Sequence, residues 1–194
     1  MKLLFENWRE FLTEDAGSID NLDPGLEITI QTYPGEDWVD IYFSEVEYPG
    51  EPAHGEPSGI IAIDLAPNCT TDKKLWQIHV NERITHGWGP VLYDIAMEWA
   101  TMNGDGLIAD RDAVSGEAWE VWDYYLQNRK DVQAHQLDDL ENTLTPEDPD
   151  NCDQEVAADP GDKWGLETSP ISKYYTKAPA LINKYKGTRI KIIQ

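Results

Sequence analysis

Cysteine is scarce in this chain of 194 residues, which has only Cys69 and Cys152. Two thiols are too few for the disulfide framework of a small secreted domain or for a zinc site built from thiolates. They leave two interpretations open, a pair of free thiols or a single bridge. A fold that depends on disulfides is therefore excluded.

Long apolar runs are also missing. No stretch approaches the roughly 18 uncharged apolar residues that a transmembrane helix needs. Residues 1–5 begin as a signal peptide would, but Glu6, Arg9 and Glu10 interrupt the run before an apolar core forms. We therefore predict a protein without membrane segments that is located in the cytoplasm.

Basic residues are few, with 15 Lys and Arg against 37 Asp and Glu and a formal net charge of −22. A surface of this sign repels phosphate backbones and anionic lipid headgroups. General nucleic-acid binding and membrane binding are therefore excluded. Eight Trp, nine Tyr and clear apolar periodicity argue against the disorder that a high net charge can bring.

The charge is unevenly distributed and marks three segments. Residues 163–194 carry seven bases and one acid, whereas residues 1–162 carry eight bases and 36 acids. Residues 138–162 hold ten acids, three prolines and no base, a composition typical of a solvated linker. We predict a core over 1–137, an acidic linker over 138–162 and a basic segment over 163–194. The basic segment should end in a strand that packs back on the core, within a single domain overall.

Apolar periodicity predicts a mixed α/β fold. Leu26, Ile28 and Ile30 alternate with polar residues, as in a half-buried strand. Pro90 suits the first turn of one helix, and Ser115 suits the N-cap of another. The expected strands are 26–33, 38–44, 59–65, 75–81, 106–109, 131–137 and 188–193; the expected helices are 2–13, 90–102 and 116–127; 45–58 is expected to be a loop. This order predicts an antiparallel beginning and a βαβ-like middle.

One stretch, 75–100, has the features of an anion site. Its strand runs into a turn with Gly87 and Gly89, and a helix begins at once at Pro90. Glycines let the backbone approach a ligand closely, and a helix N-terminus presents amide groups to an anion. The pattern predicts a phosphate cradle, although the same punctuation also joins strands to helices without any ligand.

Residues 75–100 resemble the central motif of the GNAT N-acetyltransferase superfamily, in which strand four enters a Gly-x-Gly loop that holds the pyrophosphate of coenzyme A. Residues 106–128 resemble the family's next unit, a strand five followed by a helix entered through Ser115 and Ala118. The resemblance covers about residues 59–137. It implies a central mixed, mostly antiparallel sheet with flanking helices and a splayed strand pair. It also implies an acyl-CoA-dependent N-acetyltransferase, or a catalytically degenerate relative, with acetyl-CoA or coenzyme A as cofactor.

The resemblance further implies roles for single residues. His79 or Glu82 would take a proton from the acceptor amine. Tyr124 or Tyr125 would have to protonate the departing thiolate, because Trp122 stands where the family often has a tyrosine and cannot donate a comparable proton. The cofactor would lie against Val80, Arg83, Gly87, Trp88, Gly89 and Pro90, with a backbone N–H near Val80 facing the developing oxyanion.

Trp122 and the lack of two acceptor-site helices between residues 33 and 38 keep other functions open. The chain is also similar to small proteins of tailed bacteriophages, where degenerate acetyltransferase-like chains occur. The alternative is therefore a non-catalytic virion or assembly component that binds a protein partner or forms a homo-oligomer or particle, in the host cytoplasm or the virion. A DNA-mimic inhibitor is a lesser alternative, because the acids concentrate in loops rather than at phosphate-like spacing.

No metal site is expected. Two carboxylate pairs, at 110 and 112 and at 148 and 150, have the spacing of cation loops but lack the glycine and twelfth-position glutamate of a calcium loop. The histidines show no metal-ligand spacing; they are His54, His79, His86 and His135.

Overall fold

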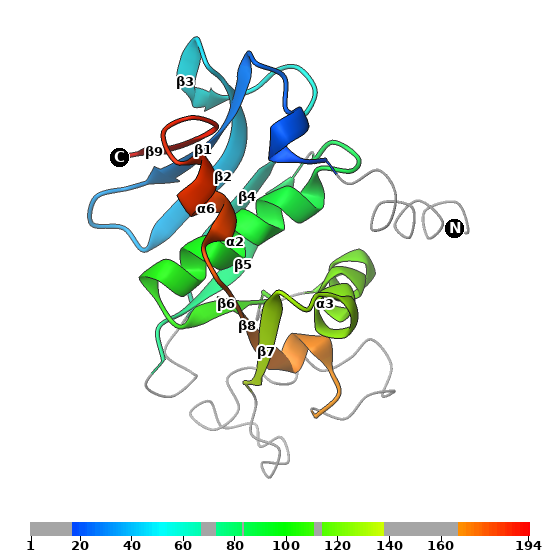
Figure 1. Ribbon diagram of the computed structural model, residues 1–194. Helices are drawn as coiled ribbons and strands as arrows, with labels where there is room; N and C mark the ends of the chain where they lie inside the picture. Colours follow the sequence, from blue (N-terminus) through cyan, green and yellow to red (C-terminus); the bar gives the residue numbers. More distant parts are fainter. Residues whose placement is uncertain (1–16, 67–72, 83, 111–113, 138–166) are drawn as a thin grey trace. The chain divides into compact units, whose positions relative to one another are not determined.

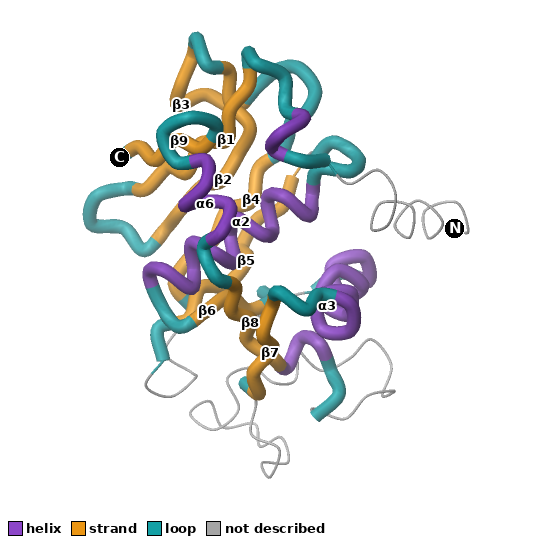
Figure 2. The backbone as a smooth tube through the Cα atoms, in the orientation of Figure 1, coloured by secondary structure: helices purple, strands orange, loops and turns teal. Residues whose placement is uncertain are grey.

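The computed structural model describes residues 17–66, 73–82, 84–110, 114–137 and 167–194. They form a mixed α/β fold with a large, mostly antiparallel open sheet and few helices (Figures 1 and 2). The strands are β1 (Leu26–Thr32), β2 (Trp38–Glu45), β3 (Tyr48–Pro52), β4 (Ile60–Leu65), β5 (Leu75–Glu82), β6 (Gly106–Ile108), β7 (Val132–Gln136), β8 (Lys173–Lys177) and β9 (Ile190–Ile193). The α-helices are α2 (Gly89–Asn103), α3 (Gly116–Asn128) and α6 (Ala180–Tyr185), and the short 3₁₀ helices are η1 (Ile19–Asn21) and η2 (Pro170–Ser172).

The described residues divide into two compact units. The first contains residues 17–63 and the described residues of Val80–Ala96 and Ala180–Gln194. The second contains Asp64–His79 and Met97–Pro179. The chain passes between the units within β4, β5 and α2.

The first unit has the strand order β4-β2-β1-β9, with β3 beside β2. β1 and β2 are antiparallel, whereas β9 is parallel to β1. The Arg189 guanidinium, just before β9, donates to the carbonyl oxygens of Leu22, Asp23 and Leu26 at 2.8 to 3.2 Å. Lys191 on β9 also pairs with Glu27 on β1 at 3.1 Å. Backbone pairing and charge together therefore fasten the C-terminal segment to β1.

The second unit has the strand order β7-β8-β6-β5. β8 is antiparallel to β7 and to β6. β6 is parallel to β5, and their register runs from Leu75 opposite Gly106 to Gln77 opposite Ile108. β6 ends there, while β5 continues to Glu82.

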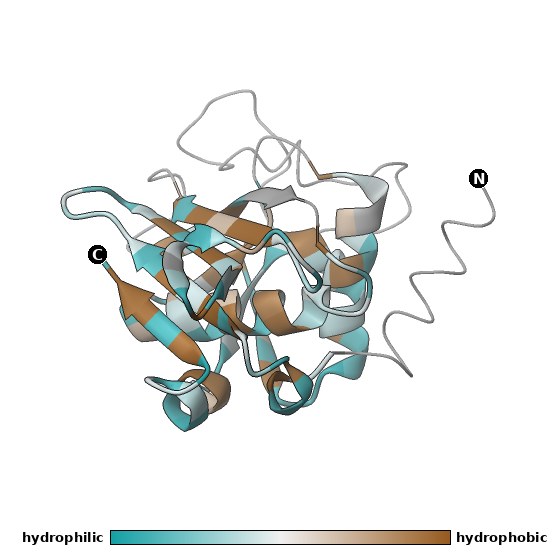
Figure 3. Ribbon diagram, turned by 90° about the horizontal axis from the view of Figure 1, so that it is seen from above, coloured by the Kyte–Doolittle hydropathy of each residue, from teal (hydrophilic) through white to brown (hydrophobic). Residues whose placement is uncertain are grey.

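Buried apolar side chains are concentrated on the strands and on α2 (Figure 3). On β1, Ile28 and Ile30 are fully buried, and so is the threonine between them. That residue, Thr29, shares a 2.6 Å hydrogen bond with the buried hydroxyl of Ser44 on β2. The strand is thus covered on both faces, and its two buried polar side chains, Thr29 and Glu27, are both paired, as a protein interior requires.

Most of the expected elements are confirmed. The structure contains the predicted strands near 26–33, 38–44, 59–65, 75–81, 106–109, 131–137 and 188–193 and the helices near 90–102 and 116–127. Ser115 caps α3 as predicted, because its Oγ accepts from the Ala118 N–H at 3.2 Å. The expected helix at 2–13, the linker at 138–162 and both cysteines lie outside the described residues.

The prediction of a loop over 45–58 is wrong, because β3 lies within it. Among the described strands, β3 pairs with β2 alone, and such an edge position tolerates the prolines and the glycine that hid the strand in the sequence. β8 was missed for a different reason. Its buried positions include Lys173 and Lys177, so the apolar alternation that marks a strand is broken.

Candidate functional site

The glycine loop between β5 and α2 belongs to the first unit and is held by backbone hydrogen bonds. Gly87 has a φ of +84°, in the left-handed region that glycine adopts without strain. Its carbonyl accepts from the Gly17 N–H at 2.7 Å, and the Trp88 N–H donates to the Thr85 carbonyl at 3.1 Å. Thr85 is itself tied to Ser58, since its N–H donates to the Ser58 carbonyl and its Oγ1 accepts from the Ser58 N–H, both at 2.8 Å. The loop is therefore a defined turn, and the Trp88 amide is engaged within it.

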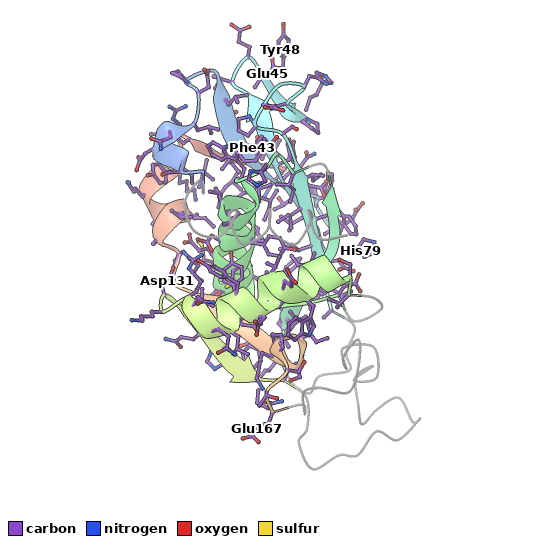
Figure 4. The ribbon with its side chains drawn as sticks, turned by 90° about the vertical axis from the view of Figure 1, so that its right-hand side faces the viewer. Phe43, Glu45, Tyr48, His79, Asp131 and Glu167 are labelled. Atoms are coloured by element: carbon purple, nitrogen blue, oxygen red, sulfur yellow. The ribbon has the colours of Figure 1, made fainter. Side chains whose placement is uncertain are left out.

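The Trp88 ring packs inside the first unit. It lies edge-on to Phe43, which Figure 4 labels, with ring centroids 5.4 Å apart and planes at 86°. Gly17 also lies against the ring, so closely that a Cβ there would clash with it. Packing against these residues explains why a tryptophan stands between two glycines, without a role in binding a ligand.

Helix α2 begins at Gly89, with Pro90 in its first turn as predicted. The first-turn amides of a helix and its dipole favour an anion at this end. Of the other residues assigned to the cofactor, Val80 lies on β5 and Arg83 lies outside the described residues. Glu82, a candidate base, is the last residue of β5. The turn and the start of α2 thus have the backbone geometry of an anion site, although Gly87 and Gly89 themselves are buried.

His79, the other candidate base, lies on β5 in the second unit, and its side chain is 48% exposed (Figure 4). Its Nδ1 is 3.9 Å from Oδ1 of Asp64 on β4. A histidine with an exposed ring near a carboxylate has the composition of a general-base site.

Asp64 stands in an incompletely satisfied polar cluster. Its Oδ2 accepts a long hydrogen bond of 3.5 Å from Nε2 of Gln77, a side chain that is only 7% exposed. In the described part of the chain, the buried Oδ1 of Asp64 and Oε1 of Gln77 have no hydrogen-bond partner. Burial raises the pKa of the Asp64 carboxyl; the hydrogen bond from Gln77 and the charge of His79 oppose this, and Asp110 adds to it.

Sequence reasoning missed Asp64 and Gln77, although two signals were present. Gln77 and His79 are two residues apart and therefore share one face of β5. Asp64 is the one acid in the apolar strand Ile60–Leu65. A lone acid beside a polar pair on neighbouring strands is the pattern that would have indicated the cluster.

The aromatic residues of α3 are mostly structural. Trp122 is buried and stacks on Tyr175 of β8, with centroids 5.0 Å apart. Tyr125 is also buried, with its centroid 6.5 Å from that of Trp122. Tyr124 is half-buried and lies edge-on to Tyr125 at 6.0 Å. Of the two candidate acids, Tyr124 is therefore the more accessible.

Among the described residues, no group of three or more His, Cys, Asp or Glu side chains is arranged to hold a metal ion. None of the helices described is long and apolar enough to cross a membrane.

Comparison with known proteins gives no relative. No protein-family model matches the chain, and neither the curated proteins nor the solved structures provide a match.

Proposed function

We propose that this chain is a GNAT-like N-acyltransferase that uses acyl-CoA, with His79 as the general base. One observation carries the proposal: β5 pairs in parallel with β6 only over Leu75–Gln77 and then runs on to Glu82 and into the glycine loop. A strand that outruns its parallel neighbour and leads directly to a helix N-terminus supports a splayed strand pair of the kind that the resemblance implies.

Coenzyme A would place its pyrophosphate at the glycine loop and the start of α2. The left-handed Gly87 and the start of α2 provide a close backbone approach and a favourable dipole. The Trp88 amide is not part of this set, because it donates to Thr85. When bound, acyl-CoA would supply an activated acyl group as a thioester.

The chain's own residues would do the rest of the chemistry. The extension of β5 past Gln77 offers strand backbone to the amide groups of an extended arm, as in strand addition to a sheet. His79, two residues past Gln77, would accept a proton from the attacking amine. Tyr124 or solvent would return a proton to the leaving thiolate.

Calorimetric titration with acetyl-CoA tests the binding step. We expect binding by the wild type and its loss in Gly89→Glu, which places a negative charge at the start of α2. Gly116→Glu is the matched control, because Gly116 is the first residue of α3 and a Cβ there meets nothing within 4 Å. Circular dichroism verifies that both variants fold. Absence of wild-type binding at millimolar acetyl-CoA would refute the proposal whatever the variants do.

A thiol-release assay with an amine acceptor tests the chemical step. His79→Ala should lower kcat by about 10²- to 10⁴-fold, the usual contribution of a general base, while acetyl-CoA binding persists. An unchanged rate in His79→Ala would remove this residue from the proposed role.

A second candidate function is a non-catalytic assembly protein, favoured by the burial of Trp122 against Tyr175. A position where the family often has a proton-donating tyrosine is here part of the core. This candidate predicts stable association with itself or with a protein partner and no turnover of any amine. Light scattering coupled to size exclusion, together with the thiol-release assay, separates the two: a monomer that turns over contradicts the assembly function.

A further inference from the structure

We infer that Asp64 is a positioning residue for His79: its Oδ1 accepts the Nδ1–H of the imidazole, so that Nε2 is the nitrogen that takes the proton of the acceptor. The inference rests on the proposed function for its part in turnover. The tautomer of His79 can be measured without any turnover.

One carboxylate oxygen of Asp64 lacks a hydrogen-bond partner among the described residues. Oδ1 of Asp64 is buried without a partner among the described residues and lies 3.9 Å from Nδ1 of His79. A buried acceptor left unpaired is costly, so we assign it the imidazole N–H of His79 as its partner. The His79 side chain is half exposed, and the inferred bond would bring its Nδ1 to within the roughly 2.8 Å of a charge-assisted hydrogen bond.

The carboxylate is held from its other side. Oδ2 of Asp64 accepts a hydrogen bond from Nε2 of Gln77, and Gln77 is only 7% exposed. Gln77 and His79 lie on one face of β5, and Asp64 lies on β4. Two strands therefore fix which oxygen faces the histidine, as a well-supported site requires.

The charges around the pair favour this role. When His79 takes up a proton, an ionised Asp64 stabilises the imidazolium that forms. The negative charge of Asp110, which also acts on Asp64, would stabilise the imidazolium further. Gln77 is neutral, so it orients the carboxylate without cancelling its charge.

Asp64→Asn is a sharp test because of Gln77. The Gln77 amide donates to the oxygen of residue 64 in either form, so the new NH₂ group must face His79 and donate to Nδ1. The imidazole proton then moves to Nε2, the nitrogen that must be free to act as the base. The matched control is Asp123→Asn on α3, another carboxyl whose pKa burial raises and which accepts from Gln127 rather than from a histidine.

Long-range ¹H–¹⁵N correlation spectra report the tautomer directly. We expect the Nδ1–H form of neutral His79 in the wild type and in Asp123→Asn, and the Nε2–H form in Asp64→Asn. The same tautomer in all three proteins would overturn the inference. Asp123→Asn controls for a general loss of stability, because partial unfolding would not replace one tautomer of His79 by the other.

Kinetics provide the second arm. Asp64→Asn should lower kcat by at least about tenfold with the KM for acyl-CoA unchanged, whereas Asp123→Asn should leave both at the wild-type level. If Asp64→Asn shows the exchanged tautomer but the wild type has no turnover, the positioning is supported and the proposed function is refuted. Wild-type turnover that survives in Asp64→Asn refutes the positioning and leaves the proposed function standing.

Discussion

Replacing Lys177 by Met should destabilise the protein more than the loss of any surface ion pair. Lys177 on β8 donates to Oε1 of Glu98 on α2 at 2.5 Å, and the two side chains are 5% and 0% exposed. The Lys177 N–H also donates to Oγ1 of Thr101 at 3.0 Å, which fixes the backbone beneath the pair. Both partners belong to the second unit.

The magnitude follows from burial. Removing one member of a buried pair leaves an uncompensated charge and typically costs about 3–5 kcal/mol. Asp131, whose Oδ2 lies 3.8 Å from the Lys177 ammonium, cannot compensate, because it carries the same charge as Glu98. Replacing both partners by apolar residues removes the desolvation penalty as well, so Lys177→Met with Glu98→Leu should regain most of the loss.

Urea unfolding followed by circular dichroism measures these differences. The control is Lys184→Met, which breaks the 3.1 Å pair with Asp20, where the side chains are 60% and 63% exposed. That variant should lose less than about 1 kcal/mol. A cost for Lys177→Met as small as that of the control, or a double variant less stable than Lys177→Met, would refute the argument from burial.

Two other predictions concern the second unit. Bidentate contact with Arg129 lowers the pKa of Asp131 to about 2, so its contribution to stability is present above the ordinary value of 3.8 and is lost as pH falls through 2. Asp131→Asn should remove up to about 1 kcal/mol at pH 7, a modest value because the pair is partly exposed, and much less at pH 2, where about half of the carboxyl is already protonated. A loss equal at both pH values, measured by urea unfolding, would contradict this. Gly106→Ala should cost about 1–3 kcal/mol, since φ is +144° and the new Cβ would lie 2.7 Å from a carbonyl oxygen of β8. Gly116→Ala, where a Cβ meets nothing within 4 Å, is its control in thermal unfolding, and equal losses would argue against backbone strain.

Most strands and helices of the fold could be predicted from local sequence patterns. The alternation of Leu26, Ile28 and Ile30 predicts β1, and Ser115 predicts the beginning of α3, because both signals depend on neighbours in the chain. β8 gave no such signal. Its inward Lys177 is compatible with a strand only because Glu98, 79 residues earlier, meets it in the core.

One part of the candidate site could also be predicted from local sequence, and another part could not. The turn at Gly87 and the helix after it are local and could be predicted. The cluster of Asp64, Gln77 and His79 depends on which strands become neighbours and on which face of each strand is buried. The sequence placed His79 among the candidates but contained no local reason to connect it with Asp64.

The pairing of β9 with β1 has a consequence for the order of folding. The hydroxyl of Thr32 donates to the carbonyl of Ile193, 161 residues further along the chain. Closing a loop of that length costs roughly 4–5 kcal/mol of chain entropy, whereas the β1–β2 hairpin closes over a short turn. The hairpin can therefore form early, with the outer edge of β1 bare until β9 arrives. During that interval β1 is open to pairing with another chain, and the late arrival of β9 is what ends the exposure.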